Sequence, residues 1–174
     1  MRIASTINDS IVDGHGMRYT VFTQGCKHNC PGCHNPDTHD LNGGHEESVK
    51  ELAKGLNNPL IEGLTLSGGE PFLQPEECLE LAKIAHDIGK NVWVYTGYRL
   101  EELIQKGDPA ELALLQEADV LVDGPFIEKQ KSYELHFRGS RNQRLIDVQK
   151  TLVYEKLTLW EEEDPLAKFK VPES

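Results

Sequence analysis

Three of the four cysteines in the chain lie within eight residues, where Cys26, Cys30 and Cys33 form the pattern C-x3-C-x2-C. Thiolates at these separations can converge on a single ion or cluster, because a short loop lets them point inward together. Three cysteines are one ligand short of a closed tetrahedral metal site. The segment therefore predicts a metal or iron–sulfur site in which one coordination position is left to another ligand.

Two other uses of the same cysteines remain open on spacing alone. A structural zinc site would need a fourth ligand, and His28 or His34 is available. Zinc knuckles usually pair two cysteine dyads across a longer spacer, however, and the sequence has no second dyad. A redox dithiol at Cys30-Pro31-Gly32-Cys33 would leave Cys26 unexplained. The pattern favours an iron–sulfur cluster over both alternatives.

The cysteine loop follows one of several strand-like segments that alternate with helix-like ones, as in a repeating βα arrangement. The hydrophobic patterns predict strands over 17–23, 60–66, 91–96 and 119–123, and helices over 47–56, 75–90, 99–106 and 109–118. Residues 151–160 are expected to form one or two further strands. Because charged or glycine-rich residues follow each strand, we expect parallel strands whose carboxyl ends share one site. Gly68-Gly69-Glu70-Pro71 stands at the end of the second predicted strand.

The composition restricts what kind of protein this is. With 174 residues and 38% hydrophobic residues, the chain is long enough for one sizeable core. Eighteen Lys and Arg against 29 Asp and Glu give a net charge of −11, which argues against a general nucleic-acid binder. The sequence has no apolar run long enough for a membrane span and no disulfide-like cysteine spacing, so we expect a cytoplasmic protein.

The positive charges are unevenly distributed, with an excess between residues 128 and 150. The basic residues there are Lys129, Lys131, Arg138, Arg141, Arg144 and Lys150. This excess fits either a solvated face or a docking surface for an acidic partner or anionic ligand. Cys78 shares one face of the helix predicted over 75–90 with Leu81, Ala82 and Ala85, so it is expected to be a core residue.

The two motifs together resemble those of the radical S-adenosylmethionine enzymes. In that family, a C-x3-C-x2-C loop binds three irons of a [4Fe–4S] cluster, and S-adenosylmethionine binds the open fourth iron. A Gly-Gly-Glu-Pro stretch after the next strand holds the methionine part of the cofactor. The resemblance implies a shortened, partial (open) βα barrel with parallel strands. It also implies cleavage of S-adenosylmethionine by one electron to give a 5′-deoxyadenosyl radical, for which the protein supplies positioning and exclusion of water.

Further segments narrow the resemblance to the activases of glycyl-radical enzymes that serve anaerobic ribonucleoside-triphosphate reductases. These segments are Gly14 to Arg18, Cys30 to Pro36, Leu66 to Pro71, Val92 to Tyr98, Val120 to Phe126 and Arg138 to Arg144. The resemblance implies the large reductase subunit as partner, with a backbone glycine as substrate, and reduced flavodoxin or a similar electron donor; a homodimer is left open. The rival readings are an activator of another glycyl-radical enzyme, such as pyruvate formate-lyase, and a zinc-stabilised binding module.

The resemblance also assigns roles to individual residues. Cys26, Cys30 and Cys33 would bind the cluster, Gly68, Gly69 and Glu70 would meet the methionine group, Gly32, Cys33 and His34 would lie along adenine, and Asp123 would accept hydrogen bonds from the ribose. Asp123 could instead cap a turn with Gly124 and Pro125. Gly32 departs from the aromatic residue that many members carry before the third cysteine. We expect a core domain over residues 1–150 and a partly polar C-terminal extension over 151–174.

Overall fold

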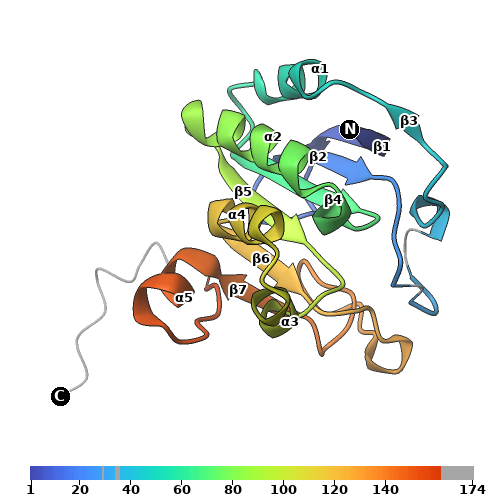
Figure 1. Ribbon diagram of the computed structural model, residues 1–174, viewed down its shortest axis with the longest axis vertical. Helices are drawn as coiled ribbons and strands as arrows, with labels where there is room; N and C mark the ends of the chain where they lie inside the picture. The colour runs from blue at the N-terminus through green and yellow to red at the C-terminus, as the bar shows by residue number, and fades with distance from the viewer. Residues whose placement is uncertain (29, 34–35, 162–174) are drawn as a thin grey trace.

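The computed structural model describes residues 1–28, 30–33 and 36–161, and these residues form a mixed α/β fold around one seven-stranded sheet (Figure 1). The strands are β1 (Arg2–Ser10), β2 (Arg18–Thr23), β3 (His45–Glu46), β4 (Gly63–Gly68), β5 (Asn91–Tyr95), β6 (Val120–Asp123) and β7 (Arg144–Asp147). Their order in the sheet is β3-β1-β2-β4-β5-β6-β7. The inner strands β2, β4, β5 and β6 run parallel, whereas β1, β3 and β7 each run antiparallel to a neighbour.

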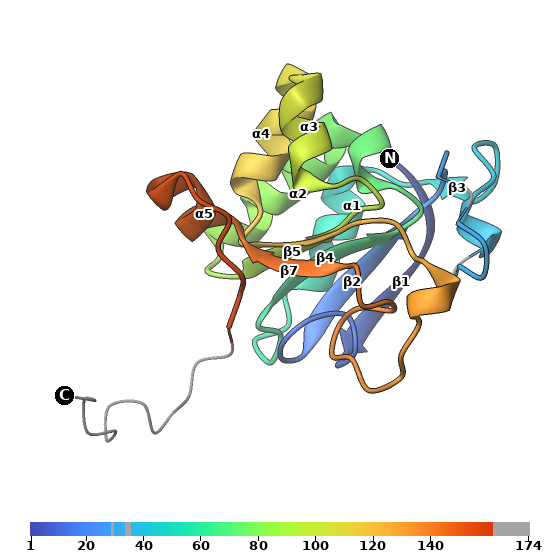
Figure 2. The ribbon, with the colours of Figure 1, turned by 90° about the horizontal axis from the view of Figure 1, so that it is seen from below.

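The helices lie mainly on one face of this sheet, as Figure 2 shows for α1 to α4. They are α1 (Val49–Ala53), α2 (Pro75–Asp87), α3 (Leu100–Lys106), α4 (Pro109–Glu117) and α5 (Val148–Tyr154). Their ends follow local chemistry. Pro75 begins α2, Asp108 caps α4 by accepting hydrogen bonds from the next backbone amides, and Gly107 ends α3 in the left-handed conformation. None of the helices in the described residues is long and apolar enough to cross a bilayer.

Two apolar clusters fill the two faces of the sheet, because side chains alternate along each strand. The main core lies under the helices and includes Leu64 and Leu66 of β4 together with Cys78 and Leu81 of α2. The expectation that Cys78 is a core residue is confirmed, since its side chain is fully buried. A smaller cluster on the opposite face contains Trp93, Val120 and Val122, with Tyr95, Phe137, Leu145 and Trp160 packed against it.

All eight strands and helices predicted from residues 17 to 123 are present, with shifted ends. The strand expected over 60–66 begins later and runs to Gly68, because the backbone turns between Asn58 and Ile61. The strands predicted over 151–160 are wrong. Asp147 caps a helix there by accepting a hydrogen bond from the Lys150 amide, and Thr151 is already helical. The sequence patterns also missed β1 and β7, whose mixed polar and apolar residues give only a weak strand signal.

The prediction of a partial βα barrel is confirmed in part: the fold is mixed α/β, and the central strands of its sheet are parallel. Within the described residues the sheet is open, with β3 and β7 at its two ends. Antiparallel strands flank the parallel block on both sides, so no further βα unit extends it toward closure. The expected domain boundary between residues 150 and 151 falls within α5 and stays a prediction.

Candidate functional site

A cavity of about 730 Å³ lies where the four parallel strands end and continues over the sheet face that carries no helices. Its walls come from the cysteine loop after β2, the ends of β4 and β5, the turn after β6, and the segments 11–13 and 135–143. The size is that of a site for a small molecule or cofactor. The expected gathering of motifs at the carboxyl ends of parallel strands is therefore confirmed.

All three clustered cysteines line this cavity as free, partly exposed thiols. Burial raises the pKa of Cys26 and of Cys30. Opposing this, the backbone N–H of His28 hydrogen-bonds the Cys26 thiol, and that of Phe126 hydrogen-bonds the Cys30 thiol. Among the described residues, no three His, Cys, Asp or Glu side chains lie close enough together to hold one metal ion.

Gly68 and Gly69 also line the cavity, where β4 ends beside the start of the cysteine loop. A Cβ on Gly68, which has a φ of +100°, would lie 2.5 Å from the backbone nitrogen of Thr23. A Cβ on Gly69 would lie 2.4 Å from the carbonyl oxygen of Gly25. These glycines are thus required by the close approach of β4 to the chain around residues 23–25, in addition to any approach to a ligand.

Glu70 is almost fully buried, and the protein occupies both of its carboxylate oxygens. Oε1 accepts hydrogen bonds from His28 Nε2 at 2.6 Å, Thr96 Oγ1 at 2.8 Å and the Gly97 amide at 2.8 Å. Oε2 accepts from the Phe72 amide at 3.1 Å. A contact from Glu70 to a methionine group stays a prediction, and its carboxylate in this structure holds the surrounding backbone instead.

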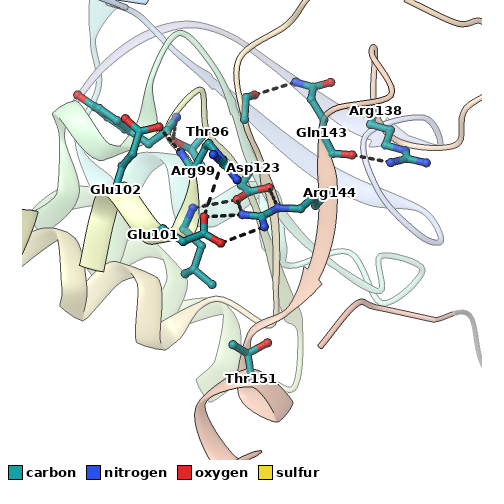
Figure 3. Close-up of polar contacts among 12 residues, drawn as sticks. Thr96, Arg99, Glu101, Glu102, Asp123, Arg138, Gln143, Arg144 and Thr151 are labelled. Atoms are coloured by element: carbon teal, nitrogen blue, oxygen red, sulfur yellow. Dashed lines mark hydrogen bonds and ion pairs between the residues drawn. The ribbon is translucent and has the colours of Figure 1, made fainter. Parts of the chain in front are cut away.

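Asp123, the residue expected near a ribose, is fully buried at the end of β6 (Figure 3). Its Oδ1 accepts a hydrogen bond from Arg144 Nε at 3.0 Å, and its Oδ2 accepts from the Leu100 amide at 2.8 Å and from Arg144 Nη2. The ribose contact stays a prediction, since both oxygens are bonded within the protein. The hydrogen bonds from Arg144 also lower the pKa of Glu101 to about 2.

Of the three residues expected along adenine, one lines the cavity. Cys33 lines the cavity, but Gly32 is exposed outside its wall, where a Cβ would lie 3.0 Å from the carboxyl carbon of Glu128. Gly32 has a φ of +71°, so the turn requires a residue that tolerates the left-handed conformation. His34 lies outside the described residues.

Several cavity residues were not identified from sequence. Tyr95 packs against the smaller core and also lines the cavity, where its hydroxyl donates a 2.6 Å hydrogen bond to the Phe137 carbonyl. Phe126 and Arg138 also lie in the wall. The signal that could have found Tyr95 and Phe126 is their position at the ends of parallel strands, where the cysteines and Gly68 also lie.

Arg138 is held at the cavity by a loop that folds on itself (Figure 3). Gln143 Oε1 accepts hydrogen bonds from the amides of Gly139 and Ser140, and its Nε2 donates to the Gly124 carbonyl at 3.0 Å. Arg138 Nη1 donates to the Gln143 carbonyl at 2.5 Å. Hydrogen bonds therefore hold the segment from 138 to 144 together and attach it to the end of β6.

Comparison with known proteins assigns this arrangement to a family. A model described as a 4Fe-4S single cluster domain matches residues 12–146. The chain is 40% identical over 143 residues to the anaerobic ribonucleoside-triphosphate reductase-activating protein of Salmonella typhi and 38% identical to that of Escherichia coli (strain K12). Each of these matches covers 76% of this chain and 90% of the relative.

Two further matches cover comparable shares of the chain. The protein of the same name from Enterobacteria phage T4 is 37% identical over 142 residues, covering 77% of this chain and 86% of the phage protein. The crystal structure of QueE from Escherichia coli matches with a TM-score of 0.45 and 13% identity over 70% of each chain. By its sequence identity to these proteins and its match to the 4Fe-4S single cluster domain, the chain belongs to the family of anaerobic ribonucleoside-triphosphate reductase-activating proteins.

Proposed function

We propose that this protein is a radical S-adenosylmethionine oxidoreductase that generates a glycyl radical on an anaerobic ribonucleoside-triphosphate reductase. The observation that carries the proposal is the convergence of Cys26, Cys30 and Cys33 with Gly68 and Gly69 on one cavity, in a member of this family. Its relatives are named as activating proteins of that reductase.

The residues present fit a [4Fe–4S] cluster. Three free thiols line a single cavity, and cysteine thiolates are the usual ligands of such clusters. His28 Nε2 is committed to Glu70, so this nitrogen is not available as a fourth protein ligand in the described conformation. Cys26, Cys30 and Cys33 would hold the cluster. When bound, it would supply the one-electron reduction that splits S-adenosylmethionine into methionine and a 5′-deoxyadenosyl radical.

The chain itself supplies position and shielding. Gly68 and Gly69 at the end of β4 leave that part of the cavity wall without side chains, so a ligand can approach the backbone closely. Tyr95, Phe126 and Phe137 give the wall an aromatic lining that displaces water. A site that excludes water protects a reactive intermediate from side reactions. No acid or base from the protein is required for these tasks.

We propose that the basic residues of segment 128–141 form a docking surface for an acidic region of the partner. Arg141, Lys129 and Lys131 are exposed on this segment, and Arg138 reaches the cavity edge. Arg144, which the sequence grouped with them, is bonded to Asp123 and Glu101 and is a structural residue. The Lys131–Ser140 bridge and the hydrogen bond from the Arg141 amide to the Gln130 carbonyl hold these cations next to Arg138 and Gly139, which line the cavity.

Replacing Lys129, Lys131 and Arg141 together by Gln should weaken binding of the reductase, because exposed charges steer and hold an oppositely charged partner. Formation of 5′-deoxyadenosine without the reductase should be unchanged, since none of the three side chains lines the cavity. Binding is measured under anaerobic conditions at two salt concentrations. A triple variant on the helical face, Lys50, Lys54 and Lys83 to Gln, is the control for lost charge, since all three side chains are exposed. Equal affinities of both triple variants would contradict the docking surface.

The function is tested by an anaerobic mixture of the reconstituted protein, S-adenosylmethionine, a reductant and the candidate reductase. Electron paramagnetic resonance should show a glycyl radical on the reductase and none when S-adenosylmethionine is left out. Pyruvate formate-lyase, used in place of the reductase, tests the nearest rival function. Reduced flavodoxin and a chemical reductant are compared as electron donors.

Metal analysis separates the enzyme from a zinc-stabilised binding module. Anaerobic reconstitution should give a brown protein with about four irons per chain, as an all-cysteine [4Fe–4S] site implies. One zinc per chain, with no iron taken up, would overturn the proposal.

A further inference from the structure

We propose that His28 is a positioning residue for the cluster loop: its ring is anchored between Glu70, Gly97 and Tyr98, and this anchor fixes the hydrogen bond from the His28 amide to the sulfur of Cys26. The inference deepens the proposed function and rests on it, because the property that the anchor would set is the reduction potential of the cluster.

The ring of His28 is held from two sides. Its Nε2 lies 2.6 Å from Glu70 Oε1, and the His28 side chain is 17% exposed while that of Glu70 is 1% exposed. The ring also packs edge-on against Tyr98, with ring centroids 4.5 Å apart and an interplanar angle of 76°. A charge-assisted hydrogen bond to a buried acceptor is stronger than one in solvent, so the ring has one preferred place.

Gly97 provides the space that this ring occupies. A Cβ at position 97 would lie 2.5 Å from His28 Cδ2 and 2.8 Å from both Cγ and Nε2. No side chain heavier than hydrogen fits there while the ring stays in place. Gly97 is not among the glycines with positive φ, so the close approach of His28, and not the backbone conformation, accounts for a glycine at this position.

The acceptor of the anchor, Glu70, is itself held by hydrogen bonds from three other residues. Thr96 Oγ1 and the Gly97 amide bond Glu70 from the end of β5, and the Phe72 amide bonds it from the residues after β4. Buried carboxylates keep such partners because leaving one unpaired is costly. Two neighbouring strand ends thus determine where the His28 ring lies.

The anchored residue lies midway between two cysteines of the cluster loop. Its backbone N–H hydrogen-bonds the Cys26 thiol. Hydrogen bonds to ligand sulfurs stabilise the more negative, reduced state of an iron–sulfur cluster and thereby raise its potential. Fixing the ring therefore fixes a hydrogen bond that would tune electron transfer.

The test compares four single variants by an anaerobic redox titration of the reconstituted chain, without S-adenosylmethionine or reductase. His28→Ala should make the midpoint potential more negative, with about a tenfold lower ratio of reduced to oxidised cluster at a fixed potential, or about 59 mV for one electron. Gly97→Ala should shift it in the same direction because it displaces the ring. His28→Gln, whose side-chain amide can still donate to Glu70, should have a midpoint potential closer to that of the unaltered protein than to that of His28→Ala. His45→Ala, at an exposed histidine, is the control.

A double variant sharpens the test. In a His28→Ala background, Gly97→Ala should have no further effect, because the ring with which it collides is absent. Additive shifts, unchanged potentials in His28→Ala and Gly97→Ala, or a His28→Gln variant as impaired as His28→Ala would each overturn the inference.

A readout that needs no cluster separates this inference from the proposed function. In the metal-free chain, alkylation of Cys26 should be about tenfold faster in His28→Ala than in the unaltered protein, since the loop is no longer held. Mass spectrometry quantifies it, with His45→Ala as control. Equal rates would contradict the anchor, whereas failure of the unaltered protein to bind iron would contradict only the proposed function.

Discussion

Four cysteines in this chain have the same chemistry and two different surroundings. Cys26, Cys30 and Cys33 are partly exposed around the cavity, whereas Cys78 is fully buried in α2, where burial raises the pKa of its thiol. A ligand has to reach the metal, so only the cysteines that line the cavity are suited to ligation. This contrast provides a matched control for the cluster assignment.

Replacing Cys30 by Ala should abolish iron binding on reconstitution, because a three-cysteine site loses one of its ligands. Iron content should fall from about four per chain to near zero. Cys78→Ala should retain the iron, although it should cost about 1 kcal/mol of unfolding free energy through the small cavity that it leaves. Iron and sulfide analysis measures both. Retention of a full cluster by Cys30→Ala would refute the ligand assignment.

The sequence predicted where several site residues lie, but not which residues they contact. The positions of the cysteines, Gly68 and Gly69 at one cavity could be predicted, because motif spacing and strand ends fix where backbone segments meet. The contacts of Glu70 and Asp123 could not. They depend on partners such as His28, Thr96 and Arg144 that are distant in sequence, and a local pattern carries no information about them.

Arg144 joins three elements through one guanidinium group. From β7 it bonds Asp123 at the end of β6, and it also bonds Glu101 in α3 (Figure 3). Asp123 in turn accepts a hydrogen bond from the first amide of α3. The end of the parallel sheet is therefore connected electrostatically to both its antiparallel neighbour and a helix.

Arg144→Gln should lower the free energy of unfolding by about 3 kcal/mol, because it leaves the buried carboxylate of Asp123 without its cation. Arg141→Gln, three residues earlier and exposed, should change it by less than about 0.5 kcal/mol. Urea denaturation followed by circular dichroism gives both values. Similar losses in the two variants would argue against the buried pair as the cause.

His86 joins α2 to the elements that precede β6. Its two ring nitrogens lie 2.7 Å from carboxylate oxygens of Glu117 and Asp119. A neutral imidazole can donate from one nitrogen only, so both hydrogen bonds require the charged ring. Partial burial acts to lower the pKa of His86, but the hydrogen bonds to Asp119 and Glu117 outweigh it, and the net pKa is raised.

A raised pKa in the folded state means that His86 stabilises the fold at low pH. Its contribution should be complete below the unfolded value of about 6.5 and lost as the pH rises through the folded pKa. His86→Gln should therefore reduce the free energy of unfolding more at pH 6 than at pH 9. Denaturant titrations at the two pH values measure this difference, and an equal loss at both would contradict it.

Elements were predictable where apolar periodicity was strong and local caps agreed with it. The helix from Pro75 and the strand from Asn91 are such cases. The segment after Lys150 was misjudged, because Leu152, Val153 and Tyr154 have strand-like side chains but are exposed on a short helix that Asp147 caps. There, capping and the hydrogen bond from Thr151 to the Asp147 carbonyl outweigh residue propensity.

The described residues form two apolar cores of unequal size, and the smaller one depends on a residue from the expected C-terminal extension. Trp160 packs against Trp93 with ring centroids 5.0 Å apart, and its backbone amide donates a hydrogen bond to the Leu145 carbonyl. On the same face, the buried Arg18 lies 5.4 Å from the Trp93 ring. Residues up to 160 therefore complete the helix-free side of the sheet.

Trp160→Ala should lower the free energy of unfolding by about 2 kcal/mol, less than a fully buried tryptophan would, because the side chain is partly exposed. Tyr154→Ala, on the exposed part of the same C-terminal region, should change it by less than about 0.5 kcal/mol. The fluorescence of Trp93 reports the unfolding. A neutral Trp160→Ala variant would show that residues 1–150 are stable without this contact.

At this largest scale, the sequence predicted the layering of strands and helices but not how the sheet ends. Strand order is a non-local property, and β1 and β7 carry too little apolar alternation to be recognised beforehand.

The margins of the sheet, β3 and β7, stay apart throughout the part of the chain that the structure describes. A closed ring of strands can be entered only along its axis, which suits small diffusing molecules or the free end of a chain. A glycine in the interior of a folded polypeptide has no end to thread. An open sheet lets a loop that carries the glycine enter from the side and leave by the same route. The backbone on both sides of the glycine then stays attached to its own domain.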